Sequence, residues 1–272
     1  MFSINTNTGA MVALSNMRRI NAEMEQVQRR ISTGLRVSSA RDDGAAFAIA
    51  QGLRGDIKAY ETVNQQLNMA KGTVAVGIEA ATQISNTMND LRSVVLKLAD
   101  ENVTGDARTQ YEADYRALQE EMVNYYSNAN FNGRNLLQTA STDINVIANI
   151  DASAITLQAQ DLQSGIDALA TVPMDAASAR AMLNGGGAFE TADAAVDMAL
   201  NGLAANDRRL DRQISFNQSM SDTTEASLGA IVDADLAKES ARLQALQVKQ
   251  QLAIQALSMA ARAPQMILSL FR

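Results

Sequence analysis

Apolar residues recur at alternating steps of three and four along most of this chain, which is the spacing of helices that bury one face. A first run covers Met17–Ile31. A second restarts at Ile49 and Leu53 and predicts a helix to Leu98, roughly 75 Å long at about 1.5 Å per residue. The apolar face of this helix, called the seam below, is weakened at Asp56 and Gly77. The seam comprises twelve positions: Tyr60, Val63, Leu67, Ala70, Val74, Gly77, Ala81, Ile84, Met88, Leu91, Val95 and Leu98.

The pattern changes near the middle of the chain. Tyr111–Ala129 predicts a third helix, and Asn132-Gly133 is a turn signal. Alternating residues over 144–150 and 155–159 predict a short antiparallel hairpin. Short helices are expected around 162–170 and 176–183, followed by a flexible break at the Asn-Gly-Gly-Gly stretch 184–187.

Helical spacing then returns and continues to the end. One segment runs from Val196 to Leu228 and is interrupted at Gly229 and at the Asp-Ala-Asp stretch 233–235. The last helix runs from Leu236, and Pro264 is expected to end or kink it. The plan is therefore nearly symmetrical, with helix, joint and long helices before a small mixed middle, and the reverse order after it.

Both ends carry an apolar stripe with no sequence neighbour to cover it. A lone helix of about 25 residues is marginal in water. Two ends lying side by side would cover part of each stripe, and packing of many copies would cover the rest. The alternative is an antiparallel bundle whose termini fold back on the body. The layout alone does not separate the two.

Composition removes most catalytic chemistry. The 272 residues contain neither cysteine nor histidine, so disulfides, thiolate nucleophiles, histidine bases and Ser-His-Asp triads are excluded. A net charge of −7 without a basic cluster excludes nucleic acid as an expected partner. We also expect no membrane insertion and no cleaved signal, since neither pattern occurs.

Between the first two helices, the stretch 31–54 breaks the helical pattern with glycines, serines and adjacent carboxylates. Neighbouring carboxylates such as Asp42 and Asp43 do not face each other on a helix or strand. We therefore interpret them as helix caps rather than a catalytic pair. The glycines at 185–187 lack phosphate-loop spacing. We accordingly predict no catalytic residues, no metal site and no cofactor.

Four stretches resemble bacterial flagellin, and they occur in that family's order. They are Ser3–Leu14 (SINTNTGAMVAL), Ile31–Ala50 (ISTGLRVSSARDDGAAFAIA), Asn128–Leu137 (NANFNGRNLL) and Val232–Arg272. The last is most similar to alphaproteobacterial members. The resemblance implies a mainly α fold of long antiparallel coiled-coil helices in a rod, with a small β-hairpin region and terminal helices forming an inner tube layer. The short middle, about 130–187, implies a minimal form without outer variable domains.

The resemblance also implies domains and sites. Segments 1–31 and 236–272 would be inner-tube helices, 32–46 and 229–235 connectors, and 47–228 the rod. The connector residues would be Gly34, Arg36, Arg41, Asp42 and Asp43. The expected polymerisation interface is Ile4, Leu14, Met17, Ile20, Met24, Val27, Leu236, Leu243, Leu246, Leu257, Ile267 and Leu270. The leucines of the last helix are expected to be buried only in the polymer. Sugar attachment, if present, is expected at Ser141, Thr142, Ser153, Thr171 or Ser178.

The function implied is a secreted, non-enzymatic subunit that polymerises into the extracellular flagellar filament for motility. Its implied partners are further copies, sister flagellins, the flagellar export apparatus, an export chaperone, the filament cap and hook-associated proteins. Recognition by the animal innate receptor for flagellin is expected to be weak. The alternatives are a hook–filament junction (hook-associated) protein, an intracellular coiled-coil scaffold and an enzyme.

Overall fold

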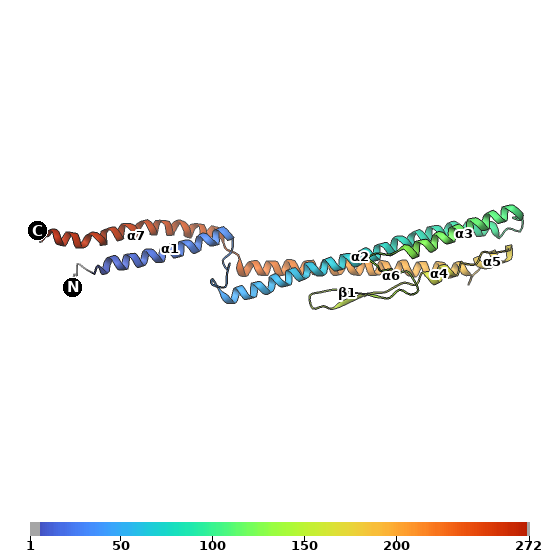
Figure 1. Ribbon diagram of the computed structural model, residues 1–272, viewed down its shortest axis with the longest axis horizontal. Helices are drawn as coiled ribbons and strands as arrows, with labels where there is room; N and C mark the ends of the chain where they lie inside the picture. The colour runs from blue at the N-terminus through green and yellow to red at the C-terminus, as the bar shows by residue number, and fades with distance from the viewer. Residues whose placement is uncertain (1–5, 271–272) are drawn as a thin grey trace. The chain divides into compact units, whose positions relative to one another are not determined.

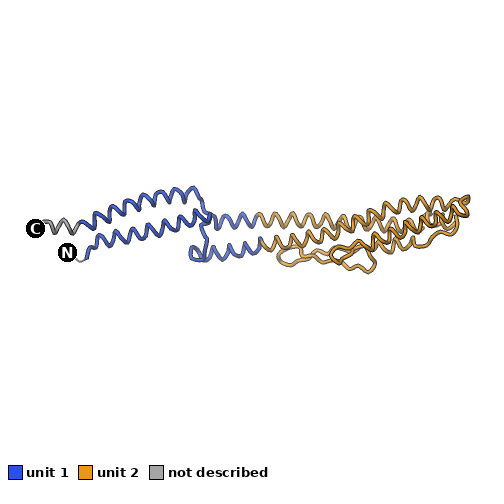
Figure 2. The backbone as a smooth tube through the Cα atoms, turned by 45° about the horizontal axis from the view of Figure 1, so that its top comes forward, with its two compact units in different colours: residues 1–57, 223–272 blue, residues 58–222 orange. Residues whose placement is uncertain are grey.

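A computed structural model describes the backbone of residues 6–270 and the side chains of residues 6–262. The described chain is mainly helical and forms two compact units, one of residues 1–57 with 223–272 and one of residues 58–222 (Figure 2). Its elements are α1 Thr8–Thr33, α2 Gly44–Leu98, α3 Gly105–Asn128, β1 Ile144–Ile147, β2 Ala154–Leu157, α4 Gln163–Asp167, α5 Ala176–Leu183, α6 Ala188–Val232 and α7 Leu236–Leu270 (Figure 1). The predicted fold class is confirmed.

The core of residues 58–222 lies along the seam that the sequence predicted in α2. All twelve seam positions from Tyr60 to Leu98 are buried. α6 packs antiparallel to α2, with Val196, Leu203 and Leu210 buried against that seam. α3 adds Tyr115 and Met122 to the same core. Burial of each large aliphatic side chain contributes roughly 1.5–3 kcal/mol, so this seam dominates the stability of the unit.

Gly77, where the seam was predicted to be weak, is a point of close contact between α2 and α6. A Cβ atom built on Gly77 would lie 3.2 Å from Cδ1 of Leu203. The missing side chain therefore lets a leucine of α6 approach the backbone of α2. This packing contact offsets the low helix propensity of glycine.

The two predicted turns of the middle region are confirmed. β1 pairs antiparallel with β2, Val146 lies opposite Ile155, and both side chains are buried. Asn132 and Gly133 have φ of 51° and 75°, the left-handed conformation that a two-residue turn requires at both central positions. The flanking residues Phe131 and Arg134 exchange backbone hydrogen bonds of 2.9 and 3.0 Å, which close the turn.

Three predicted boundaries were wrong. α2 begins at Gly44, five residues before the expected start, because Asp43 caps it. α6 passes through Gly229 to Val232, since a single helical glycine costs only about 1 kcal/mol. A Cβ on Gly229 would lie 2.8 Å from Oδ2 of Asp233, so glycine also leaves room for that carboxylate. α7 continues past position 264 to Leu270, so the helix end expected there is wrong, while the kink given as the other outcome stays a prediction.

Candidate assembly surface and its connector

α1 and α7 lie side by side over their length and form an antiparallel pair (Figure 1). Each covers the other's apolar stripe. Val27 of α1 is 1% exposed, and Leu246 of α7 is 3% exposed. The other predicted interface positions on this stripe are half-buried: Leu14, Met17, Ile20, Met24, Leu243 and Leu257. The expectation that Leu246 is buried only in a polymer is therefore wrong, because α1 of the same chain already covers it.

Of the predicted interface residues, four either lie outside this stripe or fall outside the part of the chain that the structure describes. Leu236 opens α7 and is 49% exposed. Ile4 lies outside the described residues, and the side chains of Ile267 and Leu270 also lie outside them. The stripe is therefore defined between residues 14 and 257.

Three polar contacts fix the register of the pair. The Asn7 side chain donates to the carbonyl oxygen of Ala260 at 2.7 Å. The Gln250 side chain donates to Oδ1 of Asn21 at 2.8 Å. At the other end of the pair, Nη1 of Arg30 lies 3.0 Å from Oε1 of Glu239. A one-turn slip of one helix past the other would break all three contacts.

The Arg30–Glu239 ion pair is the least expected feature of the terminal unit. The two side chains are only 20% and 11% exposed. Nε of Arg30 and Oε2 of Glu239 are buried without a hydrogen-bond partner among the described residues. Sequence analysis did not predict this pair. A local signal was present, since Arg30 follows Val27 by three positions and Glu239 precedes Leu246 by seven, which places both on the apolar stripe.

Outside the inner stripe, several large apolar side chains of α1 and α7 stay uncovered in the single chain, on outer faces that also carry polar residues. Six large side chains are between 53% and 67% exposed: Met11, Val12, Val248, Leu252, Ile254 and Met259. A groove of about 530 Å³ runs between the two helices on this side. Two of these six residues, Val12 and Leu252, line it beside small residues such as Ala256, and Asn16, Arg19 and Lys249 add polar groups to the lining. Exposed apolar side chains gathered on one pair of helices, with polar residues around them, mark a candidate protein–protein interface.

The two connectors pair with each other through their backbones. Leu35 and Asp233 form an antiparallel bridge. The amide of Ala234 donates to the carbonyl of Gly34 at 2.9 Å, and the amide of Arg36 donates to the carbonyl of Val232 at 2.7 Å. Gly34 adopts φ 72° at the end of α1, a left-handed conformation that glycine tolerates without strain. The connectors are therefore one hydrogen-bonded joint rather than two independent linkers.

Side chains reinforce this joint from one side. The guanidinium of Arg36 donates to the carbonyl of Ile231. Val37, Ala50 and Val232 form a small buried cluster beneath it. The side chain of Arg41 is exposed and forms no hydrogen bond or ion pair with the part of the chain that the structure describes.

The two adjacent aspartates have separate roles in the joint. Oδ2 of Asp42 accepts hydrogen bonds of 2.9–3.1 Å from the amides and hydroxyls of Ser38 and Ser39. The Ser38 hydroxyl bond is the largest cause holding the pKa of Asp42 below its ordinary value. Oδ1 of Asp43 accepts from the amides of Ala45 and Ala46 at 3.1 and 3.0 Å and caps α2. The carboxylates therefore order backbone instead of flanking a substrate.

The candidate attachment residues in the middle region differ in accessibility. Thr142, Ser153 and Thr171 are exposed. Ser141 is half-buried, and its hydroxyl accepts from the amide of Gln138 at 3.2 Å. The hydroxyl of Ser178 is held in a capping box with Asp175 at the start of α5. Modification at any of these positions stays a prediction, and the three exposed hydroxyls are the most accessible.

The described residues contain no group of three or more acidic side chains arranged to hold a metal ion. Of the helices in this part of the chain, none combines the length and apolar content that a bilayer crossing needs.

The two ends of the chain match known proteins separately. Residues 4–142 match the bacterial flagellin N-terminal helical region, and residues 187–271 match the bacterial flagellin C-terminal helical region. Flagellin FljM of Caulobacter vibrioides is 36% identical over 274 residues, covering 99% of this chain and 98% of that protein. A flagellin of Brucella melitensis is 35% identical over 286 residues, covering all of both chains.

One solved structure shares the fold. It is a putative flagellar hook-associated protein from Vibrio parahaemolyticus, with a TM-score of 0.58 and 15% sequence identity. The match covers 71% of this chain and all of that one. At this identity the likeness shows a common arrangement of helices and nothing finer.

Proposed function

This chain belongs to the bacterial flagellin family, and from that premise we propose that its paired terminal helices are the surface through which subunits join. As a flagellin it is a structural, non-enzymatic subunit of the extracellular flagellar filament. The predictions of family, function and location are thereby confirmed. Membership in the family also implies polymerisation of the chain with copies of itself.

The observation that carries the proposal is the uncovered outer face of the α1–α7 pair. Pairing within one chain covers the inner stripe and leaves Met11, Val248 and Leu252 in water. Each such side chain contributes roughly 1.5–3 kcal/mol when fully buried. The outer face and the groove lie on the same pair of helices, so they are available together to neighbouring copies. A contact between two different patches that does not close into a ring generates an open helix.

Domain assignments follow from this proposal. Segments 1–31 and 236–272 would form the inner tube layer, 47–228 the rod, and 32–46 with 229–235 the connectors. The helix breaks at 34–43 and 233–235 fall within the two proposed connectors, which supports the assignment.

A substitution on the outer face tests the proposal better than one on the inner stripe. Leu246→Asp would put a carboxylate between α1 and α7 of the same chain and would disturb folding as well as assembly. Leu252 is 57% exposed in the single chain, so we expect Leu252→Asp to change the monomer's helical content and thermal transition little. In a polymer it would force a carboxylate into an apolar contact, at a cost of several kcal/mol in every subunit.

We expect Leu252→Asp to abolish filament formation in sedimentation and electron microscopy of salt-induced assemblies. The matched control is Gln247→Asp, which adds the same charge to an exposed polar position on α7. This control should still assemble. Filaments of normal yield from Leu252→Asp would refute the assembly surface. Loss of assembly in both variants would assign the effect to charge and not to apolar burial.

The remaining partners are proposed from the family resemblance. They are sister flagellins in a shared filament, the flagellar export apparatus, an export chaperone, the filament cap and hook-associated proteins. We also propose that any glycan is attached in the middle region at Thr142, Ser153 or Thr171. Ser240 and Ser258 on α7 should stay bare because a glycan there would block packing. Peptide mapping of native filaments by mass spectrometry tests this: sugar on α7 would contradict it.

A further inference from the structure

The groove between α1 and α7 carries positive charge that the described residues do not neutralise. Its lining contains Arg19 and Lys249 and no carboxylate. Both side chains are exposed, and neither forms an ion pair or a hydrogen bond with the described residues. The rest of the lining is mainly apolar or small, with Leu252 beside alanines such as Ala13 and Ala253. The groove therefore suits an apolar side chain that is flanked by carboxylates.

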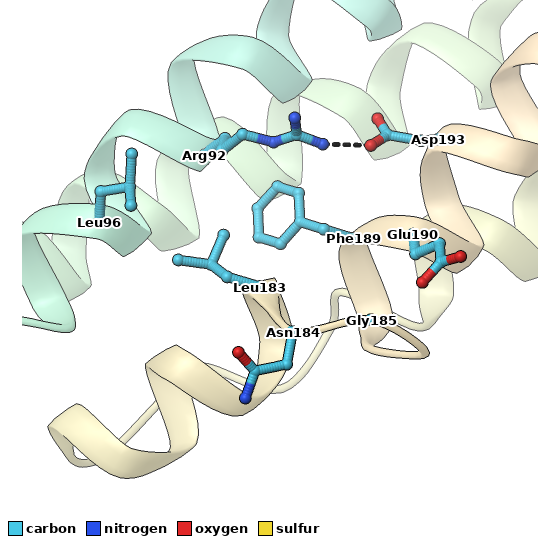
Figure 3. A pocket seen from close by; sticks show the side chains of 8 residues that line it. All are labelled: Arg92, Leu96, Leu183, Asn184, Gly185, Phe189, Glu190 and Asp193. Atoms are coloured by element: carbon cyan, nitrogen blue, oxygen red, sulfur yellow. Dashed lines mark hydrogen bonds and ion pairs between the residues drawn. The ribbon is translucent and has the colours of Figure 1, made fainter.

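A groove of about 400 Å³ in the unit of residues 58–222 shows the opposite arrangement (Figure 3). It is lined by one cation, Arg92, and by the carboxylates of Glu190 and Asp193. Arg92 forms an ion pair with Asp193, and its guanidinium lies 5.5 Å from the centre of the Phe189 ring. The chain itself neutralises the positive charge of that groove. The two cations of the terminal groove have no such internal partner in the described part of the chain.

Residues 233–236, called the docking segment below, have the chemistry that the terminal groove suits. Leu236 is 49% exposed, and Asp233 and Asp235 beside it are exposed and form no ion pair with the described residues. Among the large apolar side chains that are exposed in the described residues, only Leu236 has two carboxylates within three positions along the chain. Lys238 lies two positions further along α7, so its side chain does not face Leu236.

The docking segment cannot reach the groove of its own chain. Leu236 and Lys249 lie on the same helix, roughly 20 Å apart at about 1.5 Å per residue. Only the groove of another copy is therefore open to this segment. After each such contact forms, one copy still has a free groove and the other has a free docking segment. A contact between two different patches repeats in this way into an open assembly.

We propose that the docking segment of one copy binds in the α1–α7 groove of the next copy. This inference rests on the proposed function and names the two patches that meet. Leu236 packs beside Leu252, while the two carboxylates of the segment approach Arg19 and Lys249. The charges also set the direction of joining, because like charges meet when two grooves or two docking segments approach each other.

Charge reversal tests the contact on the full-length chain. Lys249→Glu in the groove and Asp233→Lys in the docking segment should each raise the critical concentration for assembly roughly ten-fold or more. The double variant reverses both members of the contact and should recover most of that loss. Asp233 is the better target because Asp235 also caps α7, where it accepts from the amide of Lys238 at 3.0 Å. Light scattering at moderate ionic strength measures assembly, since concentrated salt screens the charges.

Arg242→Glu is the matched control for these reversals. It reverses an exposed cation of α7 that is not part of the groove lining. This variant should assemble at the wild-type concentration. A double variant that assembles no better than either single variant would overturn the proposal. An equal loss for Arg242→Glu would also overturn it, because the effect would then follow the overall charge.

A disulfide test separates this inference from the proposed function. The chain contains no cysteine, so Leu236→Cys combined with Ala253→Cys introduces its only two thiols. The two positions are roughly 25 Å apart on one α7. A disulfide requires Cα atoms within about 7 Å, so it can join these positions only between copies. Mild oxidation of assembled filaments should therefore give a ladder of covalent oligomers on a non-reducing gel, while the unassembled chain stays monomeric.

Lys238→Cys combined with Ala253→Cys is the control for the disulfide test, because position 238 does not share the face of Leu236. This pair should give no ladder. Filaments of normal yield from Leu236→Cys with Ala253→Cys that give no ladder would refute the docking and leave the assembly surface standing. An equally strong ladder from the control pair would refute the assigned contact as well.

Discussion

At the scale of single residues, Asp42 makes the connector sensitive to acid. Hydrogen bonds from Ser38 and Ser39 hold its pKa below the ordinary value of 3.8. Its contribution to stability is therefore full above pH 3.8 and is lost as the pH falls through the lower, folded pKa. We expect Asp42→Asn to lower the melting temperature of the terminal unit at neutral pH. Melts followed by circular dichroism should show this difference vanishing in acid.

A control for this prediction is Asp56→Asn. Asp56 is an exposed residue of α2 in the same unit, and its side chain forms no hydrogen bond with the described residues. Its replacement should change the melting temperature little at any pH. A pH-independent difference between the wild-type chain and Asp42→Asn would contradict the assigned role of the carboxylate.

The buried pair of Arg30 and Glu239 gives a second prediction at this scale. Glu239→Gln would leave the Arg30 charge unpaired at a largely buried position, which should cost about 3 kcal/mol in the free energy of unfolding. The double variant Arg30→Met with Glu239→Leu should recover most of that loss, because apolar residues suit the stripe. Denaturant unfolding measures both. A double variant as unstable as the single one would show that the pair is not coupled.

At the scale of elements, glycines with different surroundings give opposite predictions. A Cβ on Gly165 of α4 would lie 2.3 Å from Cβ of Ala195, so Gly165→Ala should destabilise the protein by about 1–3 kcal/mol through overpacking. No atom outside the local backbone lies within 4 Å of a Cβ on Gly55 of α2. Gly55→Ala should instead stabilise α2 by up to about 1 kcal/mol. Thermal melts of the two variants check both signs, and a shift in the same direction would refute the packing argument.

The sequence predicted those helices and turns that are specified by residues close to one another along the chain. The apolar seam of α2 and the Asn132-Gly133 turn depend on residues close in sequence, and the structure has both. The continuation of α6 through Gly229 was missed because neighbours that support a helix outweigh one weak residue. The Arg30–Glu239 pair joins residues 209 positions apart, and no local pattern specifies which charge meets which. Leu246 was placed on the correct face but assigned the wrong covering partner.

At the scale of the whole molecule, the two units should differ in resistance to unfolding. Most residues of the stripe between the terminal helices are half-buried. In the other unit, most seam residues from Leu67 to Leu98 are fully buried. We expect limited trypsin digestion of the monomer to trim both ends first and leave a helical core of about 50–229. Mass spectrometry of the fragments identifies that core. Equal resistance of the ends and the core would contradict this order.

The polar contacts between α1 and α7 also determine when the terminal unit can fold. They join residues separated by 209, 229 and 253 positions, close to the full length of the chain. Contacts this distant form late, because nearly the whole chain must be present before its ends can meet. The seam of α2 with α3 and α6 can assemble while α7 is still being synthesised. We therefore expect a nascent or truncated chain to fold residues 58–222 before its terminal helices pair, and to present the proposed assembly surface only once α7 is complete.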